Sequence, residues 1–196
     1  MTVDELAPGL WRWTAPHPRW KESDDWEQVV GCLYYEAPEA TVLIDPLVPA
    51  ERDRFYEALD RDVERRGLPV SILLTVPWHA RSADELRERY EATSNLPSGV
   101  ERFALPEVDE TLYWLPEHRA IVPGDVLLGS GDGSVGVCPD SWLDERSSPE
   151  SIRTSLQPLL GLPIELILVS HGDPVLADGQ AALERALSPT TPPASA

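Results

Sequence analysis

Four short segments place polar side chains directly after apolar runs. They are residues 42–46 (VLIDP), 75–82 (TVPWHARS), 122–127 (VPGDVL) and 168–175 (LVSHGDPV). Imidazole and carboxylate groups are ligands for zinc or ferrous iron, and an arginine binds carboxylates or phosphates. These segments therefore hold residue types suited to metal binding or to anion binding.

Motifs of other chemistries are missing. The sequence has no Walker loop, no Rossmann glycine fingerprint and no G-x-S-x-G elbow. Residues 129–136 are rich in glycine but lack the lysine of a phosphate loop, so we interpret them as a flexible connection. Cys32 and Cys138 form no C-x-x-C pair, and two buried free thiols are predicted, with a disulfide left open.

The elements that would carry these segments follow from hydrophobic periodicity. Apolar runs at 70–75 and 164–170 are typical of strands buried on both faces. We predict a capping box between Ser82 and Glu85 and a helix end at Gly67. The remaining pattern predicts strands at 10–14, 29–36, 41–45, 101–104, 111–115 and 120–122, and helices at 50–66, 82–90, 148–160 and 178–187.

Length and charge limit the class of protein. The 196 residues suit one domain over 1–187, followed by a tail at 188–196 that we expect to be disordered. The net charge of −18 should repel phosphate backbones and anionic lipids, so we expect a small-molecule substrate or ligand, with no nucleic acid and no membrane as partner. The start lacks the apolar region of a signal peptide, and no apolar run spans a bilayer, so we expect a cytoplasmic protein.

In their order and spacing, the four segments resemble elements of the metallo-β-lactamase superfamily. Residues 42–46 resemble its "IDP/IDT" strand end, and 75–82 lie where members carry T-H-x-H-x-D-H. Residues 122–127 resemble the family's "GD" turn, whose aspartate bridges two metals, and 168–175 resemble its terminal "GHG-x-P" element, whose histidine is a ligand. The resemblance spans about Leu6 to Leu187 and implies an α/β (α+β) fold, a four-layer αββα sandwich with a pocket at the sheet edges.

The usual histidine motif of that family is largely lost here. With Thr75 aligned, the family's two leading histidines, its aspartate and its third histidine fall on Val76, Trp78, Ala80 and Arg81. The family's "PGHT" histidine should lie just before Thr111, where this chain has 106–109 (PEVD). The resemblance therefore implies a degenerate metal site.

Two ligand positions of the family remain, and a third residue lies close to the lost motif. Asp125 and His171 match the family's ligands directly, whereas His79 is one residue out of register. If His79 turned inward, the three would form a two-histidine, one-carboxylate set for zinc or iron, to which Asp45 or Glu107 could add an oxygen.

Metal-free roles stay open for the same residues. Arg81 could pair with Asp125 in place of an ion, because a guanidinium forks well onto a carboxylate. The Asp125 carboxylate could instead satisfy turn amides, and His171 could be a hydrogen-bonded structural histidine. His79 could line a pocket or pack on the neighbouring indole.

Residues of the same segments are candidates for the lining of a pocket. Trp78, Arg81 and Asp45 are candidates for the substrate pocket. We interpret His17 and His118 as surface residues. The cluster of Trp11, Trp13, Trp20 and Trp26 would suit an aromatic lid or core packing, and as an exposed loop it would favour a homodimer.

Two functions follow from these observations. One is a hydrolase-like enzyme with a reduced or rebuilt metal site, acting on a small ester, thioester or lactone. The other is a metal-free relative that binds a ligand or assists assembly.

Overall fold

A computed structural model describes residues 2–188, and the first half of the chain forms a five-stranded sheet within it. The strand order is β1-β2-β3-β4-β5, with β5 parallel to β4 and the other neighbours antiparallel. The strands are β1 (Thr2–Ala7), β2 (Leu10–Pro16), β3 (Val29–Ala37), β4 (Ala40–Ile44) and β5 (Val70–Leu73).

The second half forms a four-stranded sheet of order β11-β8-β7-β6 and a separate hairpin. In this sheet β11 runs parallel to β8, while β7 is antiparallel to both of its neighbours. The strands are β6 (Glu101–Leu105), β7 (Glu110–Leu115), β8 (Ala120–Val122) and β11 (Leu166–Ile167), and the hairpin is β9 (Leu127–Ser130) with β10 (Ser134–Val137).

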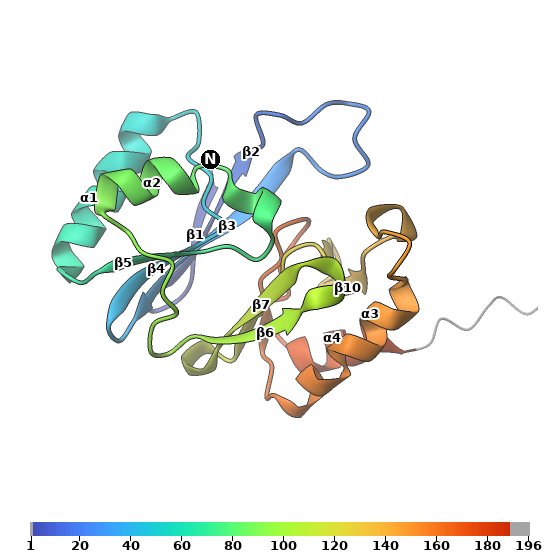
Figure 1. Cartoon of the computed structure of the whole chain (residues 1–196). Helices are drawn as coiled ribbons and strands as arrows, with labels where there is room; N and C mark the ends of the chain where they lie inside the picture. Colours follow the sequence, from blue (N-terminus) through green and yellow to red (C-terminus); the bar gives the residue numbers. More distant parts are fainter. Residues whose placement is uncertain (1, 189–196) are drawn as a thin grey trace, which may run out of the picture.

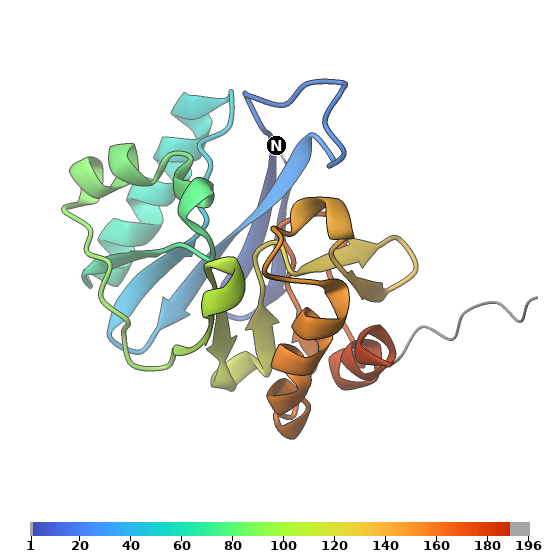
Figure 2. The ribbon, with the colours of Figure 1, turned by 45° about the vertical axis from the view of Figure 1, so that its right-hand side comes forward.

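Helices cover the outer face of each sheet. The first sheet carries α1 (Arg52–Arg66) and α2 (Ala83–Tyr90), and the second carries α3 (Pro149–Leu156) and α4 (Gly179–Leu187). Figures 1 and 2 show the two helix pairs on opposite sides of the molecule, with both sheets between them. The predicted four-layer αββα sandwich is therefore confirmed.

Alternation along the strands explains the layers, because successive side chains of a strand point to opposite faces. In β3, Cys32 and Tyr34 pack under the helices, whereas Leu33 and Tyr35 pack against the second sheet. In β7, residues 113 and 115 face the first sheet, and 112 and 114 face α3 and α4. Each sheet is thus buried on both faces.

Several predicted elements differ from the structure. The glycine-rich residues 129–136 are not a flexible connection but contribute to the β9–β10 hairpin. The predicted strand 164–170 is shorter in the structure, at Leu166–Ile167, and its end crosses to the first sheet, where Gly31 N donates to Ser170 O at 2.7 Å. The strand β1 was not predicted at all.

Some of the predicted helix ends and caps are present in the structure, and others are not. Gly67 ends α1 in the left-handed region, as expected. The capping box at α2 is not formed, because Ser82 Oγ accepts from Val48 N at 3.0 Å and Glu85 contacts Arg52 and Tyr56. Ser148 does cap α3, but the helix changes to 3-10 form at Gln157–Gly161.

The C-terminal tail predicted at 188–196 lies, apart from Ser188, outside the described residues. Among residues 2–188, no helix combines the length and apolar character that crossing a bilayer requires. Cys32 and Cys138 are both buried and free, as predicted.

Candidate metal centre and pocket

His79 is placed by a short 3-10 helix, η1 (Pro77–Ala80), that follows β5. Pro77 begins this helix, and His79 N donates to Val76 O at 3.1 Å. The tight turn directs the imidazole inward, so that His79 is 4% exposed. The inward orientation on which the three-residue set depends is therefore present.

Asp45, at the end of β4, supports His79 from behind. Its Oδ2 lies 2.9 Å from His79 Nδ1, and its Oδ1 accepts from Thr75 N at 2.8 Å. The Thr75 hydroxyl also contacts this carboxylate. A carboxylate on one ring nitrogen fixes the imidazole orientation and leaves Nε2 free to face a ligand. Asp45 thus orients His79 and, contrary to our prediction, does not line the substrate pocket.

Asp125 lies on the turn between β8 and β9, and Glu110 anchors that turn. The buried Glu110 carboxylate accepts the backbone N–H groups of Gly124, Asp125 and Val126 at 2.8, 2.8 and 3.0 Å. The suggestion that Asp125 itself satisfies the turn amides is therefore wrong. Its carboxylate is left to point toward the two histidines.

His171 follows β11 and is held by both halves of the chain. It forms an isolated bridge with Val30 of the first sheet, and its carbonyl accepts from Gly129 N of the hairpin at 3.0 Å. The rings of Trp26 and Trp142 stand edge-on to the imidazole, each with centroids 5.5 Å away. Its Nδ1 is buried and has no hydrogen-bond partner among the described residues.

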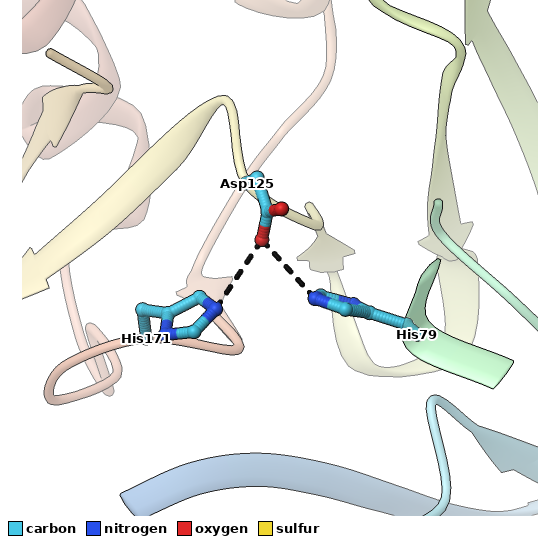
Figure 3. A group of neighbouring side chains, drawn as sticks. All are labelled: His79, Asp125 and His171. Carbon is cyan, nitrogen blue, oxygen red and sulfur yellow. Dashed lines mark ion pairs between the residues drawn. The ribbon is translucent and has the colours of Figure 1, made fainter. Parts of the chain in front are cut away.

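The three side chains converge on one point (Figure 3). One donor atom from each of His79, Asp125 and His171 can be chosen so that all lie within 4.8 Å of one another. Asp125 Oδ1 is 3.2 Å from His79 Nε2 and 3.3 Å from His171 Nε2. This oxygen is buried, yet neither contact meets hydrogen-bond geometry.

Burial and charge shift the pKa values in this cluster. Burial alone would lower the pKa of His79, but Asp45 and Asp125 outweigh it and raise that pKa to about 9. Burial opposes ionisation of Asp125, but His171 and His79 hold its pKa well below the usual range. Burial and the charge of Asp125 raise the pKa of Glu110 to about 8. Without a metal, the two carboxylates beside His79 therefore favour the protonated form of its ring.

The other oxygen of Asp125 has a separate partner. Trp78 Nε1 donates to Asp125 Oδ2 at 2.7 Å, although the Trp78 side chain projects largely into solvent. The two carboxylate oxygens thus have different environments.

Arg81 does not replace a metal by pairing with Asp125, which corrects our preferred metal-free interpretation. Its guanidinium donates to Asp45 O at 3.1 Å and Ser170 Oγ at 2.8 Å, and also to Gly31 O. These contacts tie the segments that carry Asp45 and His171 to the first sheet. Arg81 also forms part of the pocket wall.

A cavity of about 450 Å³ opens over the three candidate ligands. Its volume is within the range of small-molecule sites. Arg19, Asp25 and His17 line it from the loop between β2 and β3. Most of its remaining wall is apolar and comes from Trp26, Trp78, Trp142, Val108, Val126 and Leu143.

Sequence reasoning placed some pocket residues correctly and missed others. Trp78 and Arg81 line the pocket as expected. His17 is half-buried in the pocket wall against Trp26 and is not a simple surface residue. His118 is also half-buried, against Tyr35. Glu107 is not part of the candidate ligand group.

Sequence reasoning missed several residues of the site, among them Glu110 and Trp142. The only available signal for Glu110 was a carboxylate at the start of an otherwise apolar strand, 110–115 (ETLYWL). Trp142 had no signal, because it lies in an irregular segment far from the recognised motifs.

The tryptophan cluster divides between the core and the loop beside the pocket. Trp13 is buried in the core, and Trp11 packs on Tyr34. Trp20 donates to Trp26 O within the loop, and Trp26 reaches the pocket.

No family model and no curated protein matches the sequence. Solved structures do share its fold, at identities of 13 to 18%. A metallo-beta-lactamase from Erythrobacter litoralis has a TM-score of 0.57 at 14% identity, over 94% of this chain and 89% of that one. A metallo-beta-lactamase family protein from Thermus thermophilus has a TM-score of 0.53 at 18% identity, over 92% and 79%. A metallo-beta-lactamase from Pontibacter korlensis has a TM-score of 0.52 at 16% identity, over 95% and 96%.

Proposed function

We propose that this chain, which has the metallo-β-lactamase fold, is a hydrolase-like enzyme with a single metal site formed by His79, Asp125 and His171. The convergence of their three donor atoms within 4.8 Å is the observation that carries the proposal. A divalent zinc or iron ion in such a set supplies Lewis-acid chemistry for hydrolysis.

The residues present fit such an ion. Asp125 Oδ1 is buried without a hydrogen-bond partner among the described residues, although two imidazole nitrogens face it. A buried polar atom left in this way is costly unless a ligand satisfies it. His79 is already oriented through Nδ1 by Asp45, which is the usual arrangement for a metal-binding histidine.

The pocket supports a small substrate with an apolar part. The indoles of Trp26 and Trp142 and the side chains of Val108 and Leu143 form a wall that binds apolar groups and excludes water. Arg19 at the same cavity offers a cation to an acidic substituent. We propose that the substrates are small esters, thioesters or lactones with an apolar part.

Metal analysis of the purified protein tests the proposal. We expect about one zinc or iron ion per wild-type chain by elemental analysis and none in the Asp125→Ala/His171→Ala variant, because two of three ligands are lost. A wild-type protein that stays metal-free after growth with added zinc and iron contradicts the metal-dependent function.

Turnover tests the substrate class separately. The metal-loaded protein should hydrolyse at least one member of a panel of aryl esters, thioesters and lactones, and a chelator should abolish the activity. Metal-loaded protein that turns over none of the three classes contradicts the proposed substrates while leaving the metal site in place.

One observation favours the metal-free alternative. His79 lies between Asp45 and Asp125, which raise its pKa, and a protonated imidazole there would partly balance both carboxylates without an ion. In that case the same pocket would bind a small ligand without hydrolysing it. The metal analysis distinguishes the two functions directly.

A further inference from the structure

Trp78 occupies a position that packing does not explain. It is 59% exposed, the most exposed of the large apolar side chains among residues 2–188. Exposing so much of an indole gains little hydrophobic stabilisation. Its Nε1 is nevertheless fixed, because it donates to Asp125 Oδ2 at 2.7 Å.

This hydrogen bond distinguishes the two oxygens of one carboxylate. Oδ2 accepts from the indole, while Oδ1 lies 3.2 Å from His79 Nε2 and 3.3 Å from His171 Nε2. Glu110 fixes the backbone of Asp125 but does not touch its carboxylate. The rotation of the carboxylate is therefore controlled by Trp78 and the two histidines.

We propose that Trp78 is a positioning residue, whose indole N–H holds Asp125 Oδ2 and so keeps Oδ1 directed at the point between the two histidines. This inference rests on the metal site proposed above. Without the indole N–H, the carboxylate could rotate away from this orientation, and restoring it would cost entropy on metal binding.

The neighbouring tryptophan provides the contrast that the proposal needs. Trp142 also forms part of the pocket wall and stands edge-on to His171. Its Nε1 is buried but has no hydrogen-bond partner among the described residues. Replacing it with phenylalanine keeps an aromatic ring beside His171 and removes an N–H that contacts none of the three candidate ligands.

The experiment compares Trp78→Phe with Trp142→Phe and the wild-type protein. Zinc affinity is measured by competition with a chromophoric chelator. We expect Trp78→Phe to weaken zinc binding about 10- to 100-fold, the usual effect of losing a group that orients a ligand. Trp142→Phe should bind zinc as the wild type does.

The visible spectrum of bound Co²⁺ gives a second readout, because it reports the arrangement of the donor atoms. We expect Trp78→Phe to change this spectrum and Trp142→Phe to retain it. Unchanged thermal unfolding of metal-free Trp78→Phe would show that the fold is intact.

The outcomes separate this inference from the proposed function. Wild-type protein that binds neither zinc nor cobalt overturns the metal site and the role of Trp78 with it. If the wild type binds metal and Trp78→Phe matches it in both affinity and spectrum, only the role of Trp78 is overturned. Equal weakening in both tryptophan variants also overturns it, because the effect would then come from the pocket wall.

Discussion

At the scale of single residues, the three candidate ligands differ in how their neighbours support them. Asp45 orients His79, and Glu110 anchors the turn that carries Asp125. His171 has no polar support at Nδ1 from the described residues, and the edges of two indoles pack against its ring. Each supporting contact makes its own prediction.

Asp45→Asn should weaken zinc binding about 10- to 100-fold, because an amide supports the His79 imidazole less well than a carboxylate does. A competition titration with a chelator measures the change. Asp25→Asn is the matched control, since Asp25 lines the same cavity but bonds to Ser141. Equal zinc affinity in Asp45→Asn and wild type would contradict the orienting role.

Glu110→Ala should lower the free energy of unfolding by about 3 kcal/mol or more, because three backbone N–H groups, at least two of them buried, lose their acceptor. Urea denaturation measures the loss. Glu107→Ala is the control, because Glu107 Oε1 has no hydrogen-bond partner among residues 2–188. Similar stability of the two variants would show that Glu110 does not anchor the turn.

At the scale of elements, two glycines, Gly129 and Gly172, allow the loop that carries His171 to lie directly against the β9–β10 hairpin. A Cβ on Gly129 would lie 1.9 Å from Asp173 O, and one on Gly172 would lie 2.2 Å from Gly129 O. Gly172 also has a φ of +82°, which L side chains rarely adopt. The β9–β10 hairpin and the loop that carries His171 can therefore lie this close together only because both positions are glycine.

Gly129→Ala should destabilise the protein by about 3 kcal/mol, because the methyl group meets backbone atoms that cannot move aside independently. Gly136→Ala in the same hairpin is the control, since a methyl group added there would meet no atom within 4 Å among the described residues. Thermal or urea unfolding compares the two. A Gly129→Ala protein as stable as Gly136→Ala would contradict the close crossing.

Local sequence patterns predicted an element correctly only where interactions within a few residues determine it. The buried run at 70–75 and the end of α1 at Gly67 depend on periodicity and backbone freedom within a few residues. The run 164–170 was predicted as one strand, but its end contacts the other sheet, which no local pattern reveals. The predicted Ser82 cap is not formed for the same reason, because the Ser82 hydroxyl accepts instead from Val48 N of a distant segment.

The candidate site, like the elements, was only partly predictable from the sequence. Asp125 and His171 came from motif resemblance, and His79 from its chemistry and its nearness to the lost motif. Whether the His79 ring turned inward depended on η1 and on Asp45, which lies 34 residues earlier. The contacts of Arg81 with Asp45 and Ser170 were equally non-local, and its predicted pairing with Asp125 was wrong.

At the scale of the whole molecule, the candidate site joins the two halves of the sandwich. His79 follows the last strand of the first sheet, whereas Asp125 and His171 follow strands of the second. An ion bound by all three would link both halves and would bind only the folded chain.

Zinc should therefore raise the temperature of unfolding. A ligand that binds only the folded state stabilises it by about 2.7 kcal/mol at a concentration 100 times its Kd. Differential scanning calorimetry should show the shift in wild-type protein and not in Asp125→Ala/His171→Ala. The absence of any shift in protein that binds zinc would mean that zinc binds the unfolded chain as well, and would contradict a site assembled only on folding.

The net charge of −18 leads to a second prediction at this scale. We expect no binding of double-stranded DNA or of anionic vesicles even at low salt, where electrostatic attraction would be strongest. Fluorescence anisotropy and vesicle sedimentation measure this, and binding that weakens with salt would contradict it. A single domain, a homodimer and a cytoplasmic location stay predictions from the sequence.

Anomalous X-ray diffraction at the zinc absorption edge tests the central claim most directly, using crystals grown with zinc. We predict one anomalous peak, within ligand distance of His79 Nε2, Asp125 Oδ1 and His171 Nε2. The absence of a peak among these three atoms, with His79 still paired to Asp125, would contradict the metal site.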